Sequence, residues 1–291
     1  MFKILEKRTL SPDTVWMKIA SPRLARSAQP GQFVIVRVDE VGERIPLTVA
    51  DYSAAEGWVA IVTQTVGVST CKLNSLDVGD IVADIVGPLG KPSDFVAEPL
   101  DEVARTKYLF VAGGVGAAPV YPQVKWLGEH GIEADVIIGA RTGELLILTD
   151  EMRRVAGNLY LATDDGSVGY HGLVTGLMKE LIEVEGRKYD RVVTIGPMIM
   201  MKFVAATTLG YGIPTVASLN SLMVDGTGMC GACRVTVDGQ TFFTCVDGPE
   251  FDAHKVDYDE ALRRGAMYRS YEERARQRAK ENHQCKIGLD K

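Results

Sequence analysis

The chain has 291 residues, of which 46% are apolar and 24% are charged, and its formal net charge is −6. This length predicts two domains or more, and the composition predicts a globular protein that can bury a core. The acidic balance and the lack of a basic block argue against nucleic acid as a partner.

Residues 1–98 are predicted to form a small antiparallel β-barrel. Alternating or β-branched runs predict strands at 15–19, 32–38, 45–50, 58–65 and 81–86. Turn signals such as Pro30-Gly31 and Glu56-Gly57 separate these runs. Even spacing with little helical periodicity favours a barrel, although such a barrel need not bind a ligand.

Three short segments of this barrel are candidates for ligand binding. RIPLT at 44–48 places a cation and a hydroxyl beside a strand, and the small residues at 65–70 precede a short predicted helix at 71–75. Free N–H groups and hydroxyls at a helix start can bind phosphate. GPLG at 87–90 then closes the barrel.

In their order, RIPLT, QTVGVST and GPLGKPSDF resemble the flavin domain of the ferredoxin–NADP reductase superfamily. The resemblance implies bound FAD, with one motif lining the flavin and the next holding its phosphates. Arg44 stands one residue before the position at which that family has its arginine. The implied flavin-lining residues are Arg44, Pro46, Leu47 and Thr48, the implied phosphate-binding residues are Gly67, Ser69 and Thr70, and Val62, Gln64 and Thr65 are further predicted cofactor residues.

Residues 99–218 are predicted to form a doubly wound α/β domain. An apolar run at 108–112 leads into GGVGAAP at 113–119 and then into a helical stretch that ends near 130. Strand, glycine loop and helix in this order are the context of a dinucleotide phosphate site, although such a loop can also be a plain tight turn. Further strands are predicted at 134–139, 159–163 and 191–196, with helical stretches between them.

Several predicted binding residues of this domain follow its strands, where ligands of doubly wound sheets bind. Asp164 or Asp165 beside a ribose favours NAD, whereas Arg141 would suit the 2′-phosphate of NADP. Taken alone, these residues could also be ordinary turn and cap residues. By resemblance to the NAD half of the same superfamily, the predicted NAD(H)-binding residues are Gly113, Gly114, Val115, Gly116, Pro119, Arg141, Asp164, Asp165, Gly196, Pro197 and Met198.

The uncharged stretch 203–224 is long enough to span a bilayer, but its glycines, proline and polar residues make it a poor spanning helix. We therefore expect it to belong to the α/β core. The start of the chain has no long apolar segment, so we expect no secretory signal, and we expect no membrane partner. The few, clustered cysteines indicate a reduced protein, so we expect a cytoplasmic location.

Residues 219–250 contain a glycine-rich cysteine loop. Cys230 and Cys233 form a C-x2-C pair, and Cys245 follows a hairpin predicted at 234–237 and 240–244. With Asp225 included, the spacing is that of a [2Fe–2S] loop in which aspartate replaces the first cysteine. Ferric iron accepts a carboxylate ligand, so these four residues are the predicted metal ligands.

Three other interpretations of the cysteine loop remain open. Three thiolates with one more ligand would also hold a structural zinc. Free cysteines are often simply buried in a core. Cys285, far downstream in the charged segment, could be the fourth cluster ligand in place of Asp225.

Residues 251–291 form a strongly charged tail, and 271–280 predict a solvated helix that could also reach over a partner subunit. Barrel, α/β domain and cysteine loop together resemble the electron-transfer subunits of dihydroorotate dehydrogenase. With aspartate at 225 they resemble more narrowly the small subunits of NADH-dependent reduced ferredoxin:NADP oxidoreductases, also called sulfide dehydrogenase beta subunits.

The resemblance implies electron transfer between NAD(H), FAD and a [2Fe–2S] cluster. It implies a heterodimer with a larger flavin and iron–sulfur subunit, through which ferredoxin and NADP(H) react in electron bifurcation. No catalytic acid or base is predicted, because hydride transfer between nicotinamide and flavin needs none. The alternatives are the dihydroorotate-type subunit and, from another class, a non-enzymatic nucleotide-binding module with structural zinc.

Overall fold

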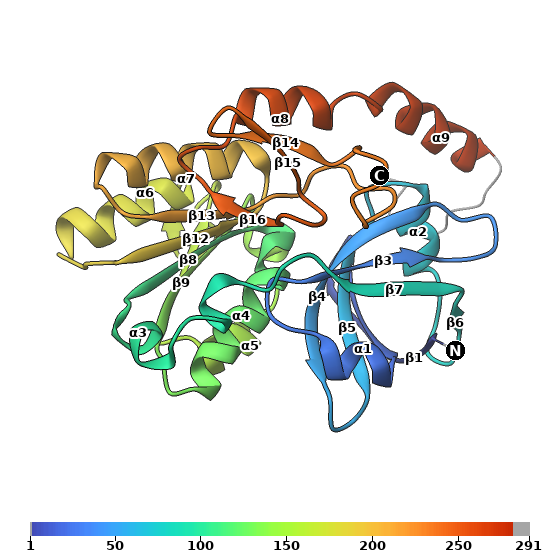
Figure 1. Ribbon diagram of the computed structural model, residues 1–291, viewed down its shortest axis with the longest axis horizontal. Coiled ribbons are helices and arrows are strands. Elements are labelled where there is room, and N and C mark those ends of the chain that lie inside the picture. Colours follow the sequence, from blue (N-terminus) through green and yellow to red (C-terminus); the bar gives the residue numbers. More distant parts are fainter. Residues whose placement is uncertain (1, 282–291) are drawn as a thin grey trace.

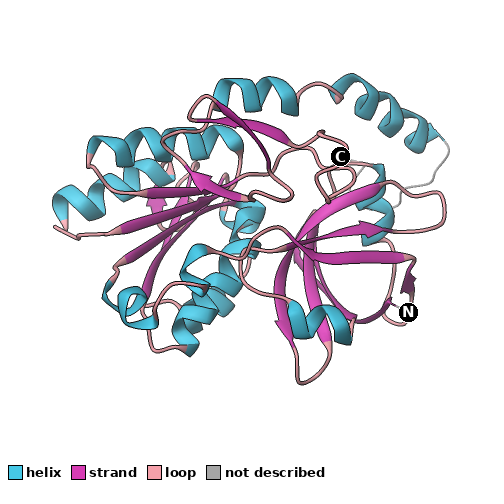
Figure 2. Ribbon diagram, in the orientation of Figure 1, coloured by secondary structure: helices cyan, strands magenta, loops and turns pink. Residues whose placement is uncertain are grey.

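The computed structural model describes residues 2–281, and its first unit is a nearly closed antiparallel barrel (Figures 1 and 2). Residues that point inward, such as Met17, Val34 and Ile61, are fully buried because alternate side chains of a strand share one face. The strand order is β6 (Ile81–Val82), β1 (Phe2–Ser11), β2 (Thr14–Ala20), β5 (Trp58–Gln64), β4 (Arg44–Ser53), β3 (Phe33–Arg37) and β7 (Asp84–Leu89). Helices α1 (Pro22–Ser27) and α2 (Val68–Asn74) pack against β5, and a short 3-10 helix, η1 (Asp94–Val96), follows the barrel.

The predicted barrel is confirmed, and strands occupy each of the five predicted runs. The run at 81–86 contains β6 and the first half of β7. The sequence analysis misses β1, in which only Ile4 and Ser11 are buried, so the strand carries no clear apolar alternation. This strand pairs with β2 along nearly its whole length.

The second unit is the predicted doubly wound α/β sheet, which is confirmed. Its neighbouring strands are parallel, except that the last one, which follows the cysteine loop, is antiparallel. The order is β11 (Tyr170–His171), β10 (Asn158–Thr163), β9 (Ala134–Ala140), β8 (Tyr108–Gly113), β12 (Arg191–Ile195), β13 (Thr215–Ser218) and β16 (Glu250–Asp252). Every residue of β8 is buried, as expected for a central strand covered on both faces.

Helices cover both faces of this sheet (Figure 1). Val120 and Val124 of α4 share one apolar core with the sheet and with Trp16 and Ala50 of the barrel. The two units therefore have a continuous hydrophobic interface. The helices of the second unit are α3 (Leu100–Arg105), α4 (Ala117–Glu129), α5 (Thr149–Val155), α6 (Val174–Lys179), a π-helix η4 (Glu180–Val184) and α7 (Met198–Gly210), with 3-10 turns η2 (Gly114–Gly116) and η3 (Gly143–Leu145).

The cysteine loop, residues 219–249, leaves the sheet after β13 and returns to it as β16, where Glu250 is the register partner of Ser218. Within it, β14 (Arg234–Val237) and β15 (Gln240–Phe243) form the predicted hairpin, which is confirmed. Its turn residues Asp238 and Gly239 both have positive φ, at 52° and 72°, as the favoured two-residue hairpin turns require. The predicted boundary at residue 250 lies at the start of β16, and the domain boundaries remain predictions.

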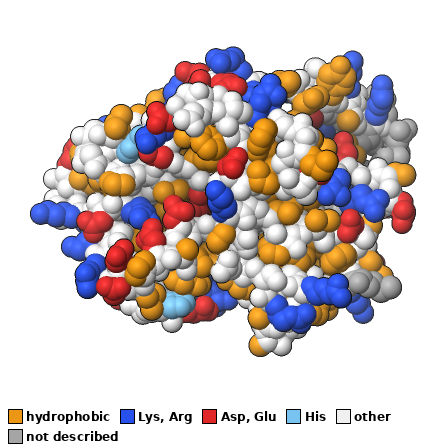
Figure 3. Space-filling view, in the orientation of Figure 1, with side chains coloured by type: hydrophobic (Ala, Val, Ile, Leu, Met, Phe, Trp, Pro, Cys, Tyr) orange, Lys and Arg blue, Asp and Glu red, His pale blue; other side chains and the backbone are white. Residues whose placement is uncertain are grey.

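Two helices follow the cysteine loop, α8 (Tyr258–Gly265) and α9 (Arg269–Glu281), and the predicted helix at 271–280 is confirmed within α9. Tyr258 is buried in a core that also contains Val235 and Val237 of the hairpin. Charged side chains of both signs lie over α8 along the upper edge of the molecule (Figure 3). No helix in the described residues is long and apolar enough to cross a bilayer.

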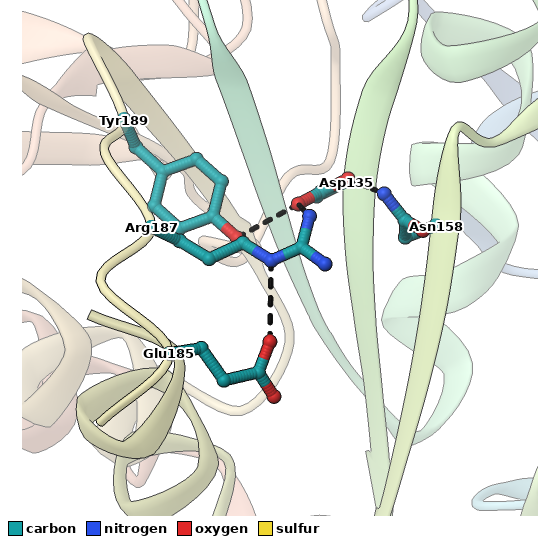
Figure 4. A network of polar contacts seen from close by, with 5 residues as sticks. All are labelled: Asp135, Asn158, Glu185, Arg187 and Tyr189. Carbon is teal, nitrogen blue, oxygen red and sulfur yellow. Dashed lines mark hydrogen bonds and ion pairs between the residues drawn. The ribbon is translucent and has the colours of Figure 1, made fainter. Parts of the chain in front are cut away.

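A polar network fixes the amino-terminal end of the parallel sheet, away from the strand ends that bind ligands (Figure 4). The Asp135 carboxylate accepts hydrogen bonds from the Tyr189 hydroxyl at 2.8 Å, from Arg187 at 3.2 Å and from the Asn158 amide at 2.8 Å. Arg187 also donates to Glu185 at 3.3 Å. Asp135 therefore joins β9 to β10 and to the segment that precedes β12.

Candidate functional site

A cavity of about 830 Å³ lies between the barrel and the parallel sheet. Its volume is within the range of about 300–1,000 Å³ that is usual for ligand pockets. The lining residues are Ser11, Asp13, Thr14, Phe33, Pro46, Leu47, Thr48, Val62 and Gln64 from the barrel; Gly113, Gly114, Val115, Gly116, Ala118, Pro119, Gly139, Ala140, Arg141, Leu145, Ile147, Asp164, Gly172, Leu173, Val174, Ile195, Gly196, Pro197, Ile199 and Met200 from the second unit; and Ser218, Leu219, Asn220, Ser221, Met223 and Pro249 at the two ends of the cysteine loop.

The cavity brings together most of the cofactor residues predicted from the sequence. From RIPLT it takes Pro46, Leu47 and Thr48, and from the second unit it takes the glycine loop at 113–119 except Ala117. The predicted residues that line it are Pro46, Leu47, Thr48, Val62, Gln64, Gly113, Gly114, Val115, Gly116, Pro119, Arg141, Asp164, Gly196 and Pro197. The predicted residues that do not line it are Arg44, Thr65, Gly67, Ser69, Thr70, Asp165 and Met198.

The glycine loop between β8 and α4 gives the backbone both close packing and open space. At Gly116 an added Cβ would overlap with the carbonyl oxygen of Ile195, so only glycine lets α4 start this close to β12. Gly114 has a φ of 55°, and a Cβ there would meet no atom within 4 Å. This open space beside backbone N–H groups fits the pyrophosphate of a dinucleotide.

The start of α2 has the same kind of space, although it lies outside the cavity lining. A Cβ added to Gly67 would meet no atom within 4 Å. The Thr70 hydroxyl accepts hydrogen bonds from the N–H groups of Val66 at 3.1 Å and Gly67 at 3.0 Å, and Ser69 donates to the Glu43 carboxylate. The N–H groups of Val66 and Gly67 are therefore already bonded within the turn, and the role of this helix start in holding flavin phosphates stays a prediction.

A group of polar residues lies at the barrel wall, and of its members only Gln64 was predicted from the sequence. The Asp13 carboxylate accepts hydrogen bonds from Ser11 at 3.0 Å, Thr14 at 2.9 Å and Gln64 at 2.8 Å, and all four residues line the cavity. Burial alone would raise the pKa of Asp13, but these hydrogen bonds outweigh it and the pKa is lowered. The cavity wall therefore carries an ionised, oriented carboxylate, which suits hydroxyl or amide donors of a ligand.

Asp164 and Asp165 differ in what their carboxylates do. Asp164 lines the cavity, as Arg141 does. The Asp165 carboxylate instead accepts from the Ser167 N–H at 3.0 Å and from the Ser167 hydroxyl at 2.6 Å, which lowers the pKa of Asp165. Asp164 is thus the better placed of the two for a ribose.

Arg44 lies against the cysteine loop and not among the residues that line the cavity. Its guanidinium donates to the backbone carbonyl of Val224 at 3.3 Å and to that of Asp225 at 3.4 Å. Sequence reasoning could not find this contact, because both acceptors are backbone groups far downstream.

The three predicted thiol ligands lie in one tight loop. Cys233 and Cys245 are buried with their sulfur atoms 3.3 Å apart, whereas Cys230 is exposed. Burial, and then the neighbouring Cys233, raise the pKa of Cys245 to about 12. Phe33 and Ile35 of β3 pack against this pair, so the buried thiols contact the barrel.

Backbone N–H groups of the loop point at the sulfur atoms. The N–H groups of Ala232 and Asp225 donate to the Cys230 thiol and lower its pKa, and the N–H of Gly228 donates to Cys245. The glycines of the loop make this fold possible, with φ of 84° at Gly226. N–H groups aimed at thiolates stabilise an anionic iron–sulfur cluster, so the donor set fits such a group.

The Asp225 carboxylate is turned back onto its own loop. It accepts from the Thr227 N–H at 2.9 Å, from the Thr227 hydroxyl and from the N–H of Met229, and its pKa is lowered by the bonds from Thr227 first. Among the described residues, no three His, Cys, Asp or Glu side chains are grouped closely enough to hold a metal ion as they stand. The fourth ligand therefore stays a prediction, and Cys285, its alternative, lies outside the described residues.

Comparison with known proteins gives three similarities that extend over nearly the whole chain and one that covers the cysteine loop. Residues 220–257 match the family described as the iron-sulfur cluster binding domain of dihydroorotate dehydrogenase B. An "Uncharacterized protein in adh 3'region" of Clostridium beijerinckii is 55% identical over 283 residues, which are 97% of this chain and 96% of that protein. A Thermotoga maritima protein named "Dihydroorotate dehydrogenase B (NAD(+)), electron transfer subunit homolog" is 47% identical over 270 residues, or 93% of this chain and 92% of that one.

The third similarity is to a solved structure. It is the NADH-dependent reduced ferredoxin-NADP oxidoreductase, studied for flavin-based electron bifurcation. That structure has a TM-score of 0.87 and 44% identity to this chain, and the match covers 96% of this chain and 97% of the other. The likeness therefore includes the barrel, the parallel sheet and the cysteine loop together.

Proposed function

This chain belongs to the family of the dihydroorotate dehydrogenase B electron transfer subunits and their homologues, and from that premise we propose that it moves electrons between NAD(H), FAD and a [2Fe–2S] cluster. The relatives are named as subunits of oxidoreductases, which goes against a non-enzymatic nucleotide-binding module with structural zinc. Within this family, we assign the chain to a heterodimeric, electron-bifurcating NADH-dependent ferredoxin:NADP oxidoreductase.

One observation carries the proposal: a single cavity is lined by three parts of the chain. Leu47 and Thr48 come from the barrel, Gly114 comes from the glycine loop, and Ser221 and Met223 come from the cysteine loop. A hydride donor and its acceptor must lie in contact, and one-electron transfer needs its acceptor nearby. Three parts that share one cavity meet both requirements.

The residues of the chain hold and orient the reactants. A bound flavin supplies the exchange between two-electron hydride chemistry and one-electron chemistry. The barrel segment 46–48 would lie against it, and the loop at 113–116 would place the nicotinamide nucleotide, with Asp164 near a ribose. Asp225, Cys230, Cys233 and Cys245 would hold the cluster.

No side chain is assigned as a catalytic acid or base. Among the described residues that line the cavity there is no His, Lys, Cys or Glu, and the carboxylates are those of Asp13 and Asp164. The apolar part of the lining, which includes Phe33 and Met200, would exclude water from the reacting atoms. Hydride transfer depends on this positioning more than on proton transfer by the protein.

The partner follows from the family. The relatives are electron transfer subunits, so the chain works with a second, larger subunit. We infer that this subunit carries further flavin and iron–sulfur groups and reacts with ferredoxin and NADP(H). The dihydroorotate-type subunit is the second candidate, favoured by the match of residues 220–257 to the dihydroorotate dehydrogenase B domain.

The test is anaerobic purification of the chain with and without its native partner. We expect FAD, iron and acid-labile sulfide, visible absorption bands of a flavin and of an iron–sulfur cluster, and oxidation of NADH with an artificial electron acceptor. A protein that contains zinc but neither flavin nor iron and that fails to oxidise NADH would overturn the proposal. A co-purified subunit that oxidises dihydroorotate, without NADPH or ferredoxin activity, would select the second candidate.

A further inference from the structure

Two arginines, one from the barrel and one from α8, donate to backbone carbonyls of the cysteine loop. Arg44, at the start of β4, donates to the carbonyls of Val224 and Asp225 at 3.3 and 3.4 Å. Arg264, in the last turn of α8, donates to the carbonyl of Ala232 at 3.0 Å. The two arginines lie more than two hundred residues apart in sequence, yet their acceptors belong to one short stretch of loop.

Both acceptor sites lie next to predicted cluster ligands. Ala232 stands between Cys230 and Cys233, and the Asp225 carbonyl belongs to the predicted fourth ligand itself. Both arginines are partly buried as residues, and the bonds from Arg44 to Asp225 and from Arg264 to Ala232 are themselves partly buried. In the described part of the chain, neither arginine has an acidic side chain within ion-pair distance, and the carboxylate that Arg44 influences electrostatically is that of Asp225 in the loop itself.

This arrangement has an electrostatic consequence for a group held by the loop. A [2Fe–2S] cluster with thiolate and carboxylate ligands is anionic, and it gains one more negative charge when it is reduced. Nearby positive charge stabilises the reduced form more than the oxidised form, and it does so most strongly where water screens least. Net charge, hydrogen bonds and solvent exposure are the known determinants of cluster potential.

We propose that Arg44 and Arg264 are positioning residues that raise the reduction potential of the cluster and so favour electron transfer into it. The inference rests on the proposed function. It assigns a role to the C-terminal segment, since α8 supplies one of the two charges. It also assigns Arg44 to the surroundings of the cluster, whereas the resemblance in the sequence implied that Arg44 lines the flavin.

Arg44 further couples the cluster loop to the cavity wall. Only Ile45 separates it from Pro46, and Pro46, Leu47 and Thr48 line the cavity. A shift of β4 would therefore move the guanidinium relative to the loop. Lysine at either position keeps the charge but loses the planar, forked donor geometry, so charge and hydrogen bonding can be separated.

The experiment measures the midpoint potential of the cluster by an anaerobic redox titration followed by electron paramagnetic resonance, in the complete holoprotein. The variants are Arg44→Gln, Arg264→Gln and their lysine counterparts Arg44→Lys and Arg264→Lys. The control is Arg26→Gln, which removes an exposed charge on α1 at the opposite end of the barrel (Figure 1).

We expect each glutamine variant to have a lower cluster potential than the wild type, by more than the difference between Arg26→Gln and the wild type. The lysine variants should lie closer to the wild type than their glutamine counterparts. If a glutamine variant loses its cluster while the lysine variant keeps it at a near wild-type potential, the result also supports a role for the positive charge at that position.

Two results would overturn the inference. The first is an intact cluster whose potential is the same in both glutamine variants as in the wild type. The second is a lysine variant that shifts as far as its glutamine counterpart, since charge would then not be the cause. A wild-type protein without an iron–sulfur signal would instead overturn the proposed function, so the two failures are distinguishable.

Discussion

The Lys125 ammonium group on α4 lies 2.7 Å from the Asp51 carboxylate on β4, and this ion pair bridges the two units that enclose the cavity. The side chains are only 28% and 15% exposed. Burial alone would lower the pKa of Lys125, but the bond to Asp51 outweighs it and the pKa is raised. A second ion pair, between Arg8 and Glu151 at 2.7 Å, joins β1 to α5 across the same interface.

Lys125→Ala should lower the free energy of unfolding by about 1–3 kcal/mol, because it leaves the poorly exposed Asp51 carboxylate without its partner. Urea denaturation of the holoprotein measures this loss. The matched control is Arg105→Ala, which breaks a pair with Asp101 whose side chains are 80% and 68% exposed. That control should change the stability by less than about 0.5 kcal/mol, and equal losses in both variants would contradict a special role for Lys125.

Glu250→Gln should change how stability depends on pH. The Glu250 carboxyl accepts hydrogen bonds from Ser93 at 2.9 Å and Gln123 at 3.0 Å, where barrel, α4 and β16 meet. Burial raises the pKa of Glu250 from 4.5 to about 7, although both hydrogen bonds act in the opposite direction. Between these two pH values the folded state keeps a proton that the unfolded state has released, so stability falls as pH rises through this window.

The glutamine variant lacks this titration. The free energy of unfolding of the variant minus that of the wild type should therefore be about 1–3 kcal/mol larger at pH 8 than at pH 5. Thermal unfolding at both pH values measures the difference. The exposed Glu144, changed to Gln, is the control and should leave the pH dependence unchanged. If Glu250→Gln shifts stability equally at pH 5 and pH 8, the raised pKa is contradicted.

Asp225→Ala should abolish or weaken binding of the cluster, whereas Cys285→Ala should keep it. Iron and sulfide content per protein and the visible spectrum measure the outcome. Thr227→Ala is an informative control, because it removes the hydroxyl that donates to the Asp225 carboxylate and leaves the carboxylate in place. If Thr227→Ala loses as much iron as Asp225→Ala, the carboxylate acts mainly by folding the loop. Loss of iron in Cys285→Ala alone would show that Cys285, and not Asp225, is the fourth ligand.

Asp164→Ser should relax the preference for NADH over NADPH, because removal of the carboxylate from the cavity removes repulsion of a 2′-phosphate. We expect the ratio of kcat/KM values to shift by about tenfold toward NADPH. The neighbouring Asp165→Ser is the control, since its carboxylate is bonded to Ser167 and lies outside the cavity lining. A larger shift in Asp165→Ser than in Asp164→Ser would reverse the assignment.

Local signals in the sequence predicted much of this fold. The dipeptide Asp238-Gly239 predicted the hairpin of β14 and β15, because Asp and Gly tolerate the positive φ that a two-residue hairpin turn requires, and both residues do have positive φ. The apolar run at 108–112 predicted β8, and the glycine loop directly after it predicted the start of α4. In each case the decisive interactions are between residues a few positions apart.

Contacts between distant segments could not be predicted. Arg44 donates to a backbone carbonyl 180 residues downstream, and a backbone acceptor leaves no mark in the sequence. The three-residue strand β16 exists because it pairs with β13, since it is too short to show a periodic pattern. Asp13 looks like an ordinary turn residue until Gln64, 51 residues away, is placed beside it.

The pairing of Ser218 with Glu250 has a consequence for how such proteins can be built. Both ends of the cysteine loop are register partners in one antiparallel β-ladder, so the loop is an insertion between two adjacent strands that are hydrogen-bonded to each other. Replacing it by a tight two-residue turn would leave the flavin and nicotinamide domains joined as one reductase that lacks the cluster-binding segment for one-electron transfer. Conversely, the equivalent pair of register partners in a related reductase is the point at which a cluster-binding loop could be inserted.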